Sequence, residues 1–352
     1  MRILLSGGGT MGSVSPLIAA YQEIKKLRPE AEILFVGTKE GPEKAVIESY
    51  KIPFRSIASG KWRRYFDLRN LVDPFKVFWG FVQAYFILGK FRPNAVMIAG
   101  AFVGVPVAWA AWLRRIPVLI HQQDIIPGLA NKLMANIATK ISVSFEISLK
   151  DFFPQKTVLT GNAIRREFYD CDSKVSGHFF DLREDLPTLL ILGGGTGAIK
   201  INEIVEKSLA DLLQFCQVIH ITGKGKRVDV DVDGYHQFEF LASGMTEALC
   251  AADLIVTRAG LSTTSECVIM GKPMVIIPIP NSHQEFNAQY FQKSNAAYVL
   301  SQESLTPEMF ASVVRELLYD EAQRQNLSRN IAKMMPRDGA TRIAQLLLEI
   351  AK

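Results

Sequence analysis

The chain contains the same local sequence device twice: a short apolar run, a glycine cluster and then an amphipathic segment. The first copy is RILLSGGGTMG at residues 2–12, and the second is LLILGGGTGA at residues 189–198. Glycines permit the tight turn from a strand into a helix, and apolar residues recur at helical spacing after each cluster. Such a unit opens a parallel sheet, so two copies predict two similar α/β domains.

Apolar runs of strand length alternate with helical segments through both halves of the chain. We therefore predict an α/β fold of two Rossmann-like, doubly wound parallel-sheet domains, since 352 residues suffice for two cores. The predicted domains span 1–162 and 163–336, and residues 337–352 are predicted to form a helix that packs back across the junction. The other predicted strands are 32–37, 95–100, 117–122, 141–145 and 157–162 in the first half, and 218–223, 238–241, 254–260 and 273–280 in the second.

Both glycine clusters fit phosphate-binding turns. Residues 7–12 match the dinucleotide pattern G-x-G-x-x-G, and residues 193–198 match its looser form, which ends in alanine. Glycine lets the backbone approach a phosphate closely, and the free N–H groups of the following helix attract its charge. Taken singly, each loop also fits a turn that only packs a strand against a helix.

The end of the second strand argues against a dehydrogenase. Dinucleotide-binding enzymes normally carry an acidic residue there, which holds the ribose hydroxyls. Here the strand ends in VGTK at residues 36–39, and Glu40 lies beyond it, so the carboxylate is absent or displaced. Two phosphate-type loops instead suggest one cleft that binds a nucleotide diphosphate from one domain and a second anionic substrate from the other.

Polar clusters follow three predicted strands, at the sheet edge where ligands of open α/β sheets bind. One is TRAGLSTTSE at 257–266, where a helix start offers phosphate donors and Glu266 is placed to accept from two ribose hydroxyls. A surface helix with an ordinary glutamate explains that segment equally well. The other clusters are HQQD at 121–124 and residues 278–288, where histidine, glutamine and asparagine suit sugar hydroxyls.

Composition narrows the partners. The net charge of +5 slightly favours anionic partners such as phosphates or an acidic membrane, and it is too small to indicate nucleic acid. The four cysteines lack zinc-ligand spacing, so we expect reduced thiols in a cytosolic protein, and the first apolar run is too short for a signal peptide. The DVDVD run at 229–233 is typical of a solvated loop, so we expect no metal there.

Two stretches bear on membranes. Residues 96–113 carry no charge, but their glycines and proline favour a buried strand, loop and helix over a membrane span. Residues 61–92 interleave basic with aromatic side chains, which suits a surface that enters the lipid headgroup region. For residues 77–88, a core helix with inward-facing aromatics is an alternative. The residues predicted to contact the membrane are Trp62, Phe66, Phe75 and Trp79.

Seven segments in register resemble the UDP-GlcNAc-dependent transferases of glycosyltransferase family 28, over essentially the full chain. The resemblance implies the GT-B fold, in which two domains face each other across a cleft that holds the active site. It also implies inverting transfer of GlcNAc from UDP-GlcNAc to lipid I (undecaprenyl-pyrophosphoryl-MurNAc-pentapeptide), giving lipid II, without a cofactor or an essential catalytic metal. The segments are GGGTMGSVSP (7–16), GAFVGVP (100–106), HQQD (121–124), GNAIR (161–165), GGGTGAIKIN (193–202), TRAGLSTTSE (257–266) and HQEFNA (283–288).

Carried over by position, the resemblance assigns the donor to the second domain. The uracil would lie near Leu241, the ribose on Glu266, and the GlcNAc ring on Gln284 with His283 or Asn287 nearby. The acceptor's diphosphate would lie on the first domain's loop, at Thr10, Met11 and Gly12. The donor's diphosphate would contact Arg165, Gly195, Thr196, Gly197, Leu261, Ser262, Thr263, Thr264 and Ser265.

The chain departs from the family pattern at two places that matter for catalysis. Ser13 stands where the family has a histidine, and a neutral hydroxyl is a poor general base. Asp124 stands where the family has an amide, and we hypothesise that its carboxylate accepts the proton of the acceptor hydroxyl. Gly195 and Thr196 replace a serine and a glutamine, so phosphate binding would rely more on backbone N–H groups.

The resemblance further implies a peripheral protein at the cytoplasmic face of the inner membrane, acting in cell-wall biogenesis, cell shape and cell division. Its partners would be UDP-GlcNAc, the lipid-linked acceptor, an anionic membrane surface and other cell-wall synthesis enzymes. Three alternatives stay open: a related transferase with another lipid or secondary-metabolite acceptor, a hydrolysing UDP-GlcNAc 2-epimerase, and a catalytically impaired UDP-sugar-binding homologue that acts as a scaffold.

Overall fold

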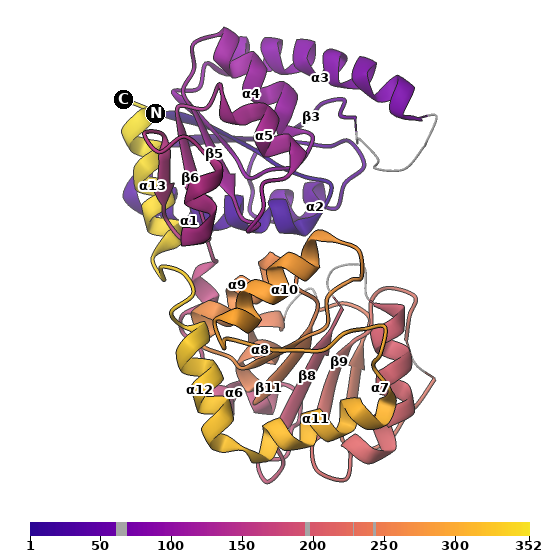
Figure 1. Cartoon of the computed structure of the whole chain (residues 1–352). Coiled ribbons are helices and arrows are strands. Elements are labelled where there is room, and N and C mark those ends of the chain that lie inside the picture. Colours follow the sequence, from indigo (N-terminus) through magenta and orange to yellow (C-terminus); the bar gives the residue numbers. More distant parts are fainter. Residues whose placement is uncertain (61–68, 194–197, 228, 242–243) are drawn as a thin grey trace. The chain divides into compact units, whose positions relative to one another are not determined.

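The chain forms two compact units in a computed structural model that describes residues 1–60, 69–193, 198–227, 229–241 and 244–352 (Figure 1). The first unit comprises Met1–Arg165 together with Met335–Lys352, and the second comprises Arg166–Met334. The first unit therefore ends three residues beyond the predicted boundary at 162, and the C-terminal helix belongs to it.

The first unit is built on a seven-stranded parallel sheet with the order β3-β2-β1-β4-β5-β6-β7. Chain order reverses between β1 and β4, which is the switch point where open α/β sheets bind ligands. The strands are β1 (Arg2–Ser6), β2 (Glu32–Gly37), β3 (Phe54–Ser56), β4 (Ala95–Ile98), β5 (Val118–Gln122), β6 (Lys140–Val143) and β7 (Thr157–Leu159).

Helices cover both faces of this sheet because side chains alternate along its strands. Ile3 and Leu5 of β1 pack into the core that α1 and α13 cover, whereas Leu4 packs with residues of α3, α4 and α5. The C-terminal helix α13 thus completes the first unit's core through its contact with α1 (Figure 1). The helices are α1 (Ser15–Leu27), α2 (Glu43–Ser49), α3 (Arg69–Phe91), α4 (Gly104–Leu113), α5 (Leu129–Ala135) and α13 (Gly339–Ile350), with 3-10 helices η1 (Met11–Ser13) and η2 (Glu146–Asp151).

The second unit repeats this plan with a six-stranded parallel sheet, in the order β10-β9-β8-β11-β12-β13. Leu189 and Ile191 of β8 pack beneath α7 and α11. The strands are β8 (Thr188–Leu192), β9 (Gln217–Ile221), β10 (Tyr235–Phe238), β11 (Leu254–Thr257), β12 (Met274–Ile276) and β13 (Tyr298–Val299). The helices are α6 (Ser173–Phe179), α7 (Ile199–Leu212), α8 (Met245–Ala251), α9 (Leu261–Met270), α10 (His283–Lys293), α11 (Pro307–Tyr319) and α12 (Glu321–Ile331), with the 3-10 helix η3 (Arg166–Phe168).

Residues 96–113 form the end of β4, a loop and helix α4, as their glycines and proline predict. Among the described residues, no helix is both long and apolar enough to span a bilayer. The predicted strand at 238–241 is wrong in its position along the chain. Strand β10 occupies Tyr235–Phe238, and Phe240 beyond it is largely exposed. Strand β10 pairs with β9 alone at the sheet edge, where apolar patterning is weakest.

The expectation of four reduced thiols is wrong for one pair. Cys171 and Cys250 form a disulfide whose Cα atoms lie 5.9 Å apart, a normal separation for such a bond. The two cysteines are 79 residues apart in the sequence and meet because α6 packs against α8, which spacing alone does not reveal. Cys216 and Cys267 are free and buried.

Candidate active site

The first glycine loop links β1 to η1 and is held in shape from within. Gly9 adopts a φ of 80°, in the left-handed region that favours glycine. The Ser13 hydroxyl accepts from the Gly8 N–H at 3.1 Å and lies 3.1 Å from the Gly8 carbonyl and 3.2 Å from the Thr10 carbonyl. Ser13 is 8% exposed, so its hydroxyl serves the loop, and this geometry favours a structural role over the predicted catalytic one.

Residues 9–12 are the accessible part of this loop. Gly7 and Gly8 are buried, whereas Gly9 and Thr10 are exposed, and Met11 and Gly12 are half-buried. The predicted acceptor-binding residues Thr10, Met11 and Gly12 therefore form the part of the turn that a ligand can reach. They lie at the carboxyl end of β1, next to the switch point of the sheet.

The segment 121–124 divides into buried and accessible halves. His121 is fully buried between Ser142 Oγ and Asn162 Oδ1, each 2.9 Å away, and burial lowers its pKa to about 4. Gln122 is also buried and donates to the carbonyls of Asp124 and Ile126, which fixes the course of the loop after β5. Of the predicted catalytic residues, Asp124 is half-buried in that loop.

In the second unit, helix α9 presents its N-terminus after β11. Its N-cap is Gly260, which offers no side-chain acceptor to the first N–H groups of the helix. The Thr264 hydroxyl donates to the Gly260 carbonyl at 3.1 Å. Leu261, Thr264 and Ser265 are buried, whereas Ser262 and Thr263 are half-buried, so the first turn is accessible only at these two residues.

Glu266 is only 7% exposed, so the alternative of a surface helix with an ordinary glutamate is wrong. The sequence predicts that its carboxylate contacts the ribose hydroxyls of the donor. Position at the carboxyl edge of the parallel sheet fits that prediction.

The start of α10 carries the predicted sugar-binding residues. The Ser282 side chain caps the helix by accepting from the Gln284 N–H at 3.2 Å. Gln284 is half-buried, and its Oε1 accepts from the Ile279 N–H at 3.2 Å. Asn287 is 1% exposed and donates to the Ala259 carbonyl at 3.0 Å, so it ties α10 to the loop before α9.

Some of the remaining predicted site residues lie in the described part of the chain, and others lie outside it. His283 is exposed at the first position of α10, and Leu241 and Arg165 are half-buried. Arg165 is the last residue of the first unit's main segment. The predicted residues that lie outside the described part of the chain are Gly195, Thr196, Gly197, Trp62 and Phe66.

Sequence analysis missed Arg258 as a residue that organises this site. Arg258 is 7% exposed, and its guanidinium donates to the carbonyls of Ile277 at 2.9 Å and Pro278 at 3.2 Å and to Gln302 Oε1. Burial lowers the pKa of Arg258 from its ordinary value. This buried cation joins the end of β11 to the segment that leads into α10, a tertiary contact that no spacing in the sequence signals.

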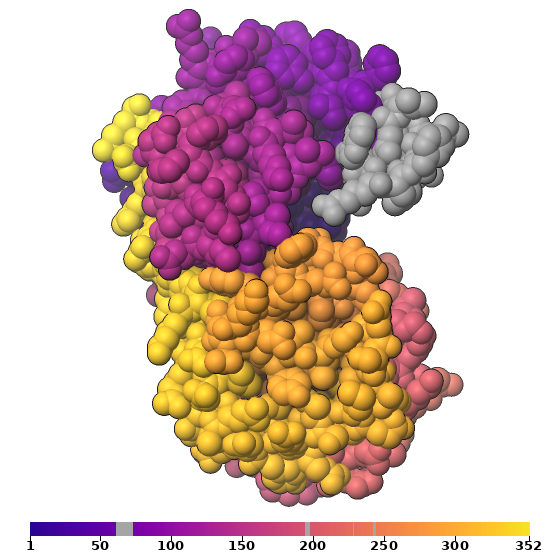
Figure 2. Space-filling view, in the orientation of Figure 1, coloured from indigo at the N-terminus to yellow at the C-terminus, as the bar shows by residue number. Residues whose placement is uncertain are grey.

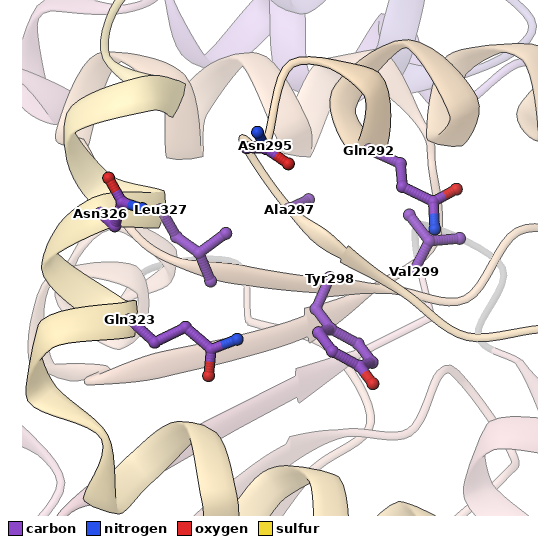
Figure 3. Close-up of a pocket in the computed structure, with 8 residues that line it drawn as sticks. All are labelled: Gln292, Asn295, Ala297, Tyr298, Val299, Gln323, Asn326 and Leu327. Atoms are coloured by element: carbon purple, nitrogen blue, oxygen red, sulfur yellow. The ribbon is translucent and has the colours of Figure 1, made fainter.

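One cavity in the second unit lies apart from these residues. A cavity of about 350 Å³ lies between α10, β13 and α12, on the face of the second unit where the orange and yellow segments meet (Figures 2 and 3). It has no predicted site residue in its lining. The residues that line the cavity are Gln292, Asn295, Ala297, Tyr298, Val299, Gln323, Asn326 and Leu327.

Among the described residues, no three histidine, cysteine, aspartate or glutamate side chains are grouped as metal ligands, and the absence of an essential metal stays a prediction.

Comparison with known proteins gives the class. Residues 3–143 match the model of the glycosyltransferase family 28 N-terminal domain, and residues 188–343 match that of the family 28 C-terminal domain. The chain therefore belongs to glycosyltransferase family 28. The crystal structure of Acinetobacter baumannii MurG shares its fold, with a TM-score of 0.74 and 22% identity over 99% of both chains. That match and the two parallel-sheet units identify the fold as GT-B, as the sequence predicts.

Two relatives carry the same full name, UDP-N-acetylglucosamine--N-acetylmuramyl-(pentapeptide) pyrophosphoryl-undecaprenol N-acetylglucosamine transferase. The protein from Clostridium kluyveri is 40% identical over 322 residues, which cover 90% of this chain and 91% of the relative. The protein from Clostridium botulinum is 38% identical over 358 residues, which cover 100% of this chain and 99% of the relative. A UDP-GlcNAc 2-epimerase from Neisseria meningitidis has a similar fold at 12% identity and a TM-score of 0.69.

Proposed function

We propose that the chain is a hexosyltransferase that moves GlcNAc from UDP-GlcNAc to lipid I, with inversion at the anomeric carbon, and so forms lipid II for peptidoglycan synthesis. The observation that carries this proposal is the full-length similarity, at 38–40% identity, to relatives named for that transfer. The site residues of both units support it, because the glycine loop of the first unit and the start of α9 in the second each suit a diphosphate.

The second unit binds the donor. The N-terminus of α9 has a glycine N-cap, so its backbone N–H groups are placed to stabilise the charge that develops on the departing UDP. Glu266, which is buried near the start of α9, accepts from the ribose hydroxyls. Gln284 contacts the GlcNAc ring, and Asn287 and Arg258 hold the segments that carry these groups in place.

The first unit binds the acceptor. Its diphosphate lies on Thr10, Met11 and Gly12, the accessible part of the glycine loop. The half-buried Asp124 takes the proton from the attacking hydroxyl, since the Ser13 hydroxyl is engaged within the loop. No cofactor is needed, because substitution at the anomeric carbon requires only positioning, proton removal and charge stabilisation.

Helices α3 and α4 support docking on an anionic membrane at the cytoplasmic face of the inner membrane. In α3, Phe75 is 75% and Trp79 is 58% exposed, and α4, which packs against α3, also exposes Trp112. The alternative, a core helix at 77–88, describes only the side of α3 that carries the buried Ala84 and Leu88. Exposed aromatic side chains of this kind partition into the headgroup region.

A transfer assay with radiolabelled UDP-GlcNAc and lipid I tests the proposal. We expect labelled lipid II, and its absence with active substrates would contradict the proposed function. Binding of UDP-GlcNAc without transfer would support the scaffold alternative. Release of UDP and N-acetylmannosamine without acceptor would support the epimerase alternative.

A further inference from the structure

The carboxylate of Glu43 lies directly behind the first glycine loop, and the proposed transfer does not use it. Glu43 is the first residue of α2 and is 0% exposed. Its Oε2 accepts from the Gly9 N–H at 3.1 Å, and its Oε1 accepts from the Thr38 N–H at 2.7 Å and from the Thr38 hydroxyl. One side chain thus links the loop after β1 to the loop after β2.

Three glycines leave the space that this side chain fills. A Cβ at Gly8 would collide with Glu43 Oε1, and a Cβ at Gly41 would collide with Glu43 Oε2 and with the Thr38 hydroxyl. A Cβ at Gly37 would lie 3.1 Å from Glu43 Cγ and closer still to the Phe54 ring. Side chains at these positions would displace the carboxylate, so the segments around it are built to admit it.

The Glu43 carboxylate is held by hydrogen bonds that it accepts, and not by an ion pair within the described part of the chain. Among the described residues its hydrogen-bond partners are two backbone N–H groups and one hydroxyl, and none is a cation. An ionised carboxylate only accepts, and the start of a helix favours its charge. Gly9 is exposed, but its N–H is directed at Glu43, so residues 10–12 are the accessible part of the loop that remains for a ligand.

We propose that Glu43 is a positioning residue for the acceptor: by holding Gly9 it fixes the conformation in which Thr10, Met11 and Gly12 receive the lipid diphosphate. This inference rests on the proposed function. It also explains the apparently missing acid of the first unit. A carboxylate does lie after the second strand, but it faces the glycine loop and is shut away from any ribose, so this unit is specialised for a diphosphate without a nucleoside.

The decisive variant is Glu43→Gln, which keeps the shape of the side chain and replaces one oxygen by an NH2 group. Thr38 supplies two donors, so the remaining oxygen stays on Thr38 and the new NH2 group meets the Gly9 N–H, where two donors repel each other. We expect the KM for lipid I to rise about tenfold, with the KM for UDP-GlcNAc unchanged, since one hydrogen bond to a charged group is lost.

Ile47→Val is the matched control, because it trims a buried side chain of the same helix and leaves the hydrogen bonds of Glu43 in place. A merely structural role would make both variants lose stability and change both KM values alike, and that result would overturn the proposal. An unchanged KM for lipid I in Glu43→Gln would overturn it as well.

Amide hydrogen exchange of the full chain separates this proposal from the proposed function. In Glu43→Gln we expect exchange at residues 8–13 to accelerate at least about tenfold relative to Ile47→Val, whether or not the wild type transfers GlcNAc. Unchanged exchange would contradict the loop contact itself. A wild type that fails to make lipid II would instead contradict the proposed function and leave the exchange result to decide the role of Glu43 in the loop.

Discussion

The two units share one plan, but the glycine loop of the first unit and the start of α9 in the second differ in how their backbone N–H groups are used. In the first unit the N–H groups of Gly8 and Gly9 already have partners, Ser13 Oγ and Glu43 Oε2. In the second unit, α9 begins at Gly260, which has no side chain to occupy the first N–H groups of the helix. The glycine loop of the first unit is therefore fixed in advance by the side chains of Ser13 and Glu43, whereas the start of α9 keeps backbone donors for a ligand. The difference predicts a rigid acceptor site and a donor site completed by the nucleotide.

The largest effect is expected from Asp124→Asn, which tests whether proton transfer belongs to the first unit. Loss of a general base lowers kcat by about 100- to 10,000-fold. The affinity for UDP, measured by calorimetry, should not change, because Asp124 is not among the predicted donor residues, which apart from Arg165 lie in the second unit. Unchanged kcat would remove Asp124 from the mechanism.

A smaller effect is expected from Glu266→Gln, which tests whether the second unit alone reads the nucleoside. Weaker acceptance from the ribose hydroxyls should raise the KM for UDP-GlcNAc by about 10- to 100-fold and leave the KM for lipid I unchanged. A donor with 2′-deoxyribose sharpens the test. Compared with UDP-GlcNAc, it should bind the wild type more weakly, but it should bind the Glu266→Gln variant almost as well as UDP-GlcNAc does. Equal penalties in both proteins would show that Glu266 does not contact the ribose.

A third prediction concerns the membrane surface, which the proposal assigns to the first unit only. Replacing Phe75, Phe78 and Trp79 by serine should weaken binding to anionic vesicles by about tenfold, since exposed aromatic area is lost. Flotation with vesicles measures it. Replacing the exposed Phe240 and Phe286 of the second unit by serine is the control, and equal loss in both variants would contradict a docking surface confined to α3 and its neighbour.

The sequence predicted the plan of both units well because the deciding signals are local. The repeated strand–glycine–helix device and the alternation after it place the parallel sheets, and β2 has the bounds predicted for it. Contacts between elements that are distant in the sequence could not be predicted. Glu43 was overlooked because its partners come from two loops, Arg258 because its acceptors follow a different strand, and the pairing of Cys171 with Cys250 because it depends on helix packing.

The same limit applies to roles within recognised segments. His121 and Asn287 are both polar residues in segments that resemble the family, yet both are fully engaged inside the fold. Spacing identifies a segment that belongs near a ligand. It does not say which side chain points toward the ligand and which one holds the segment in place, because that choice depends on partners from other elements.

The smallest expected effect compares the two units through acid, because each buries one neutral histidine in a central strand. Burial lowers the pKa of His121 in β5 and of His220 in β9 from 6.5 to about 4. The unfolded chain then binds protons that the folded chain refuses, so each histidine contributes stability above pH 6.5 that is lost as the pH falls toward about 4. Between pH 6.5 and pH 5.5 the loss is about 1 kcal/mol per histidine.

Chemical denaturation of His121→Gln and His220→Gln at the two pH values measures this contribution. Each variant starts less stable than the wild type, because a hydrogen-bonded core side chain is replaced, but it should lose about 1 kcal/mol less on acidification. The comparison becomes sharper if the units unfold separately, because each variant should then flatten the pH dependence of its own unit only. A variant with the full wild-type dependence would mean that its histidine is not held neutral by burial.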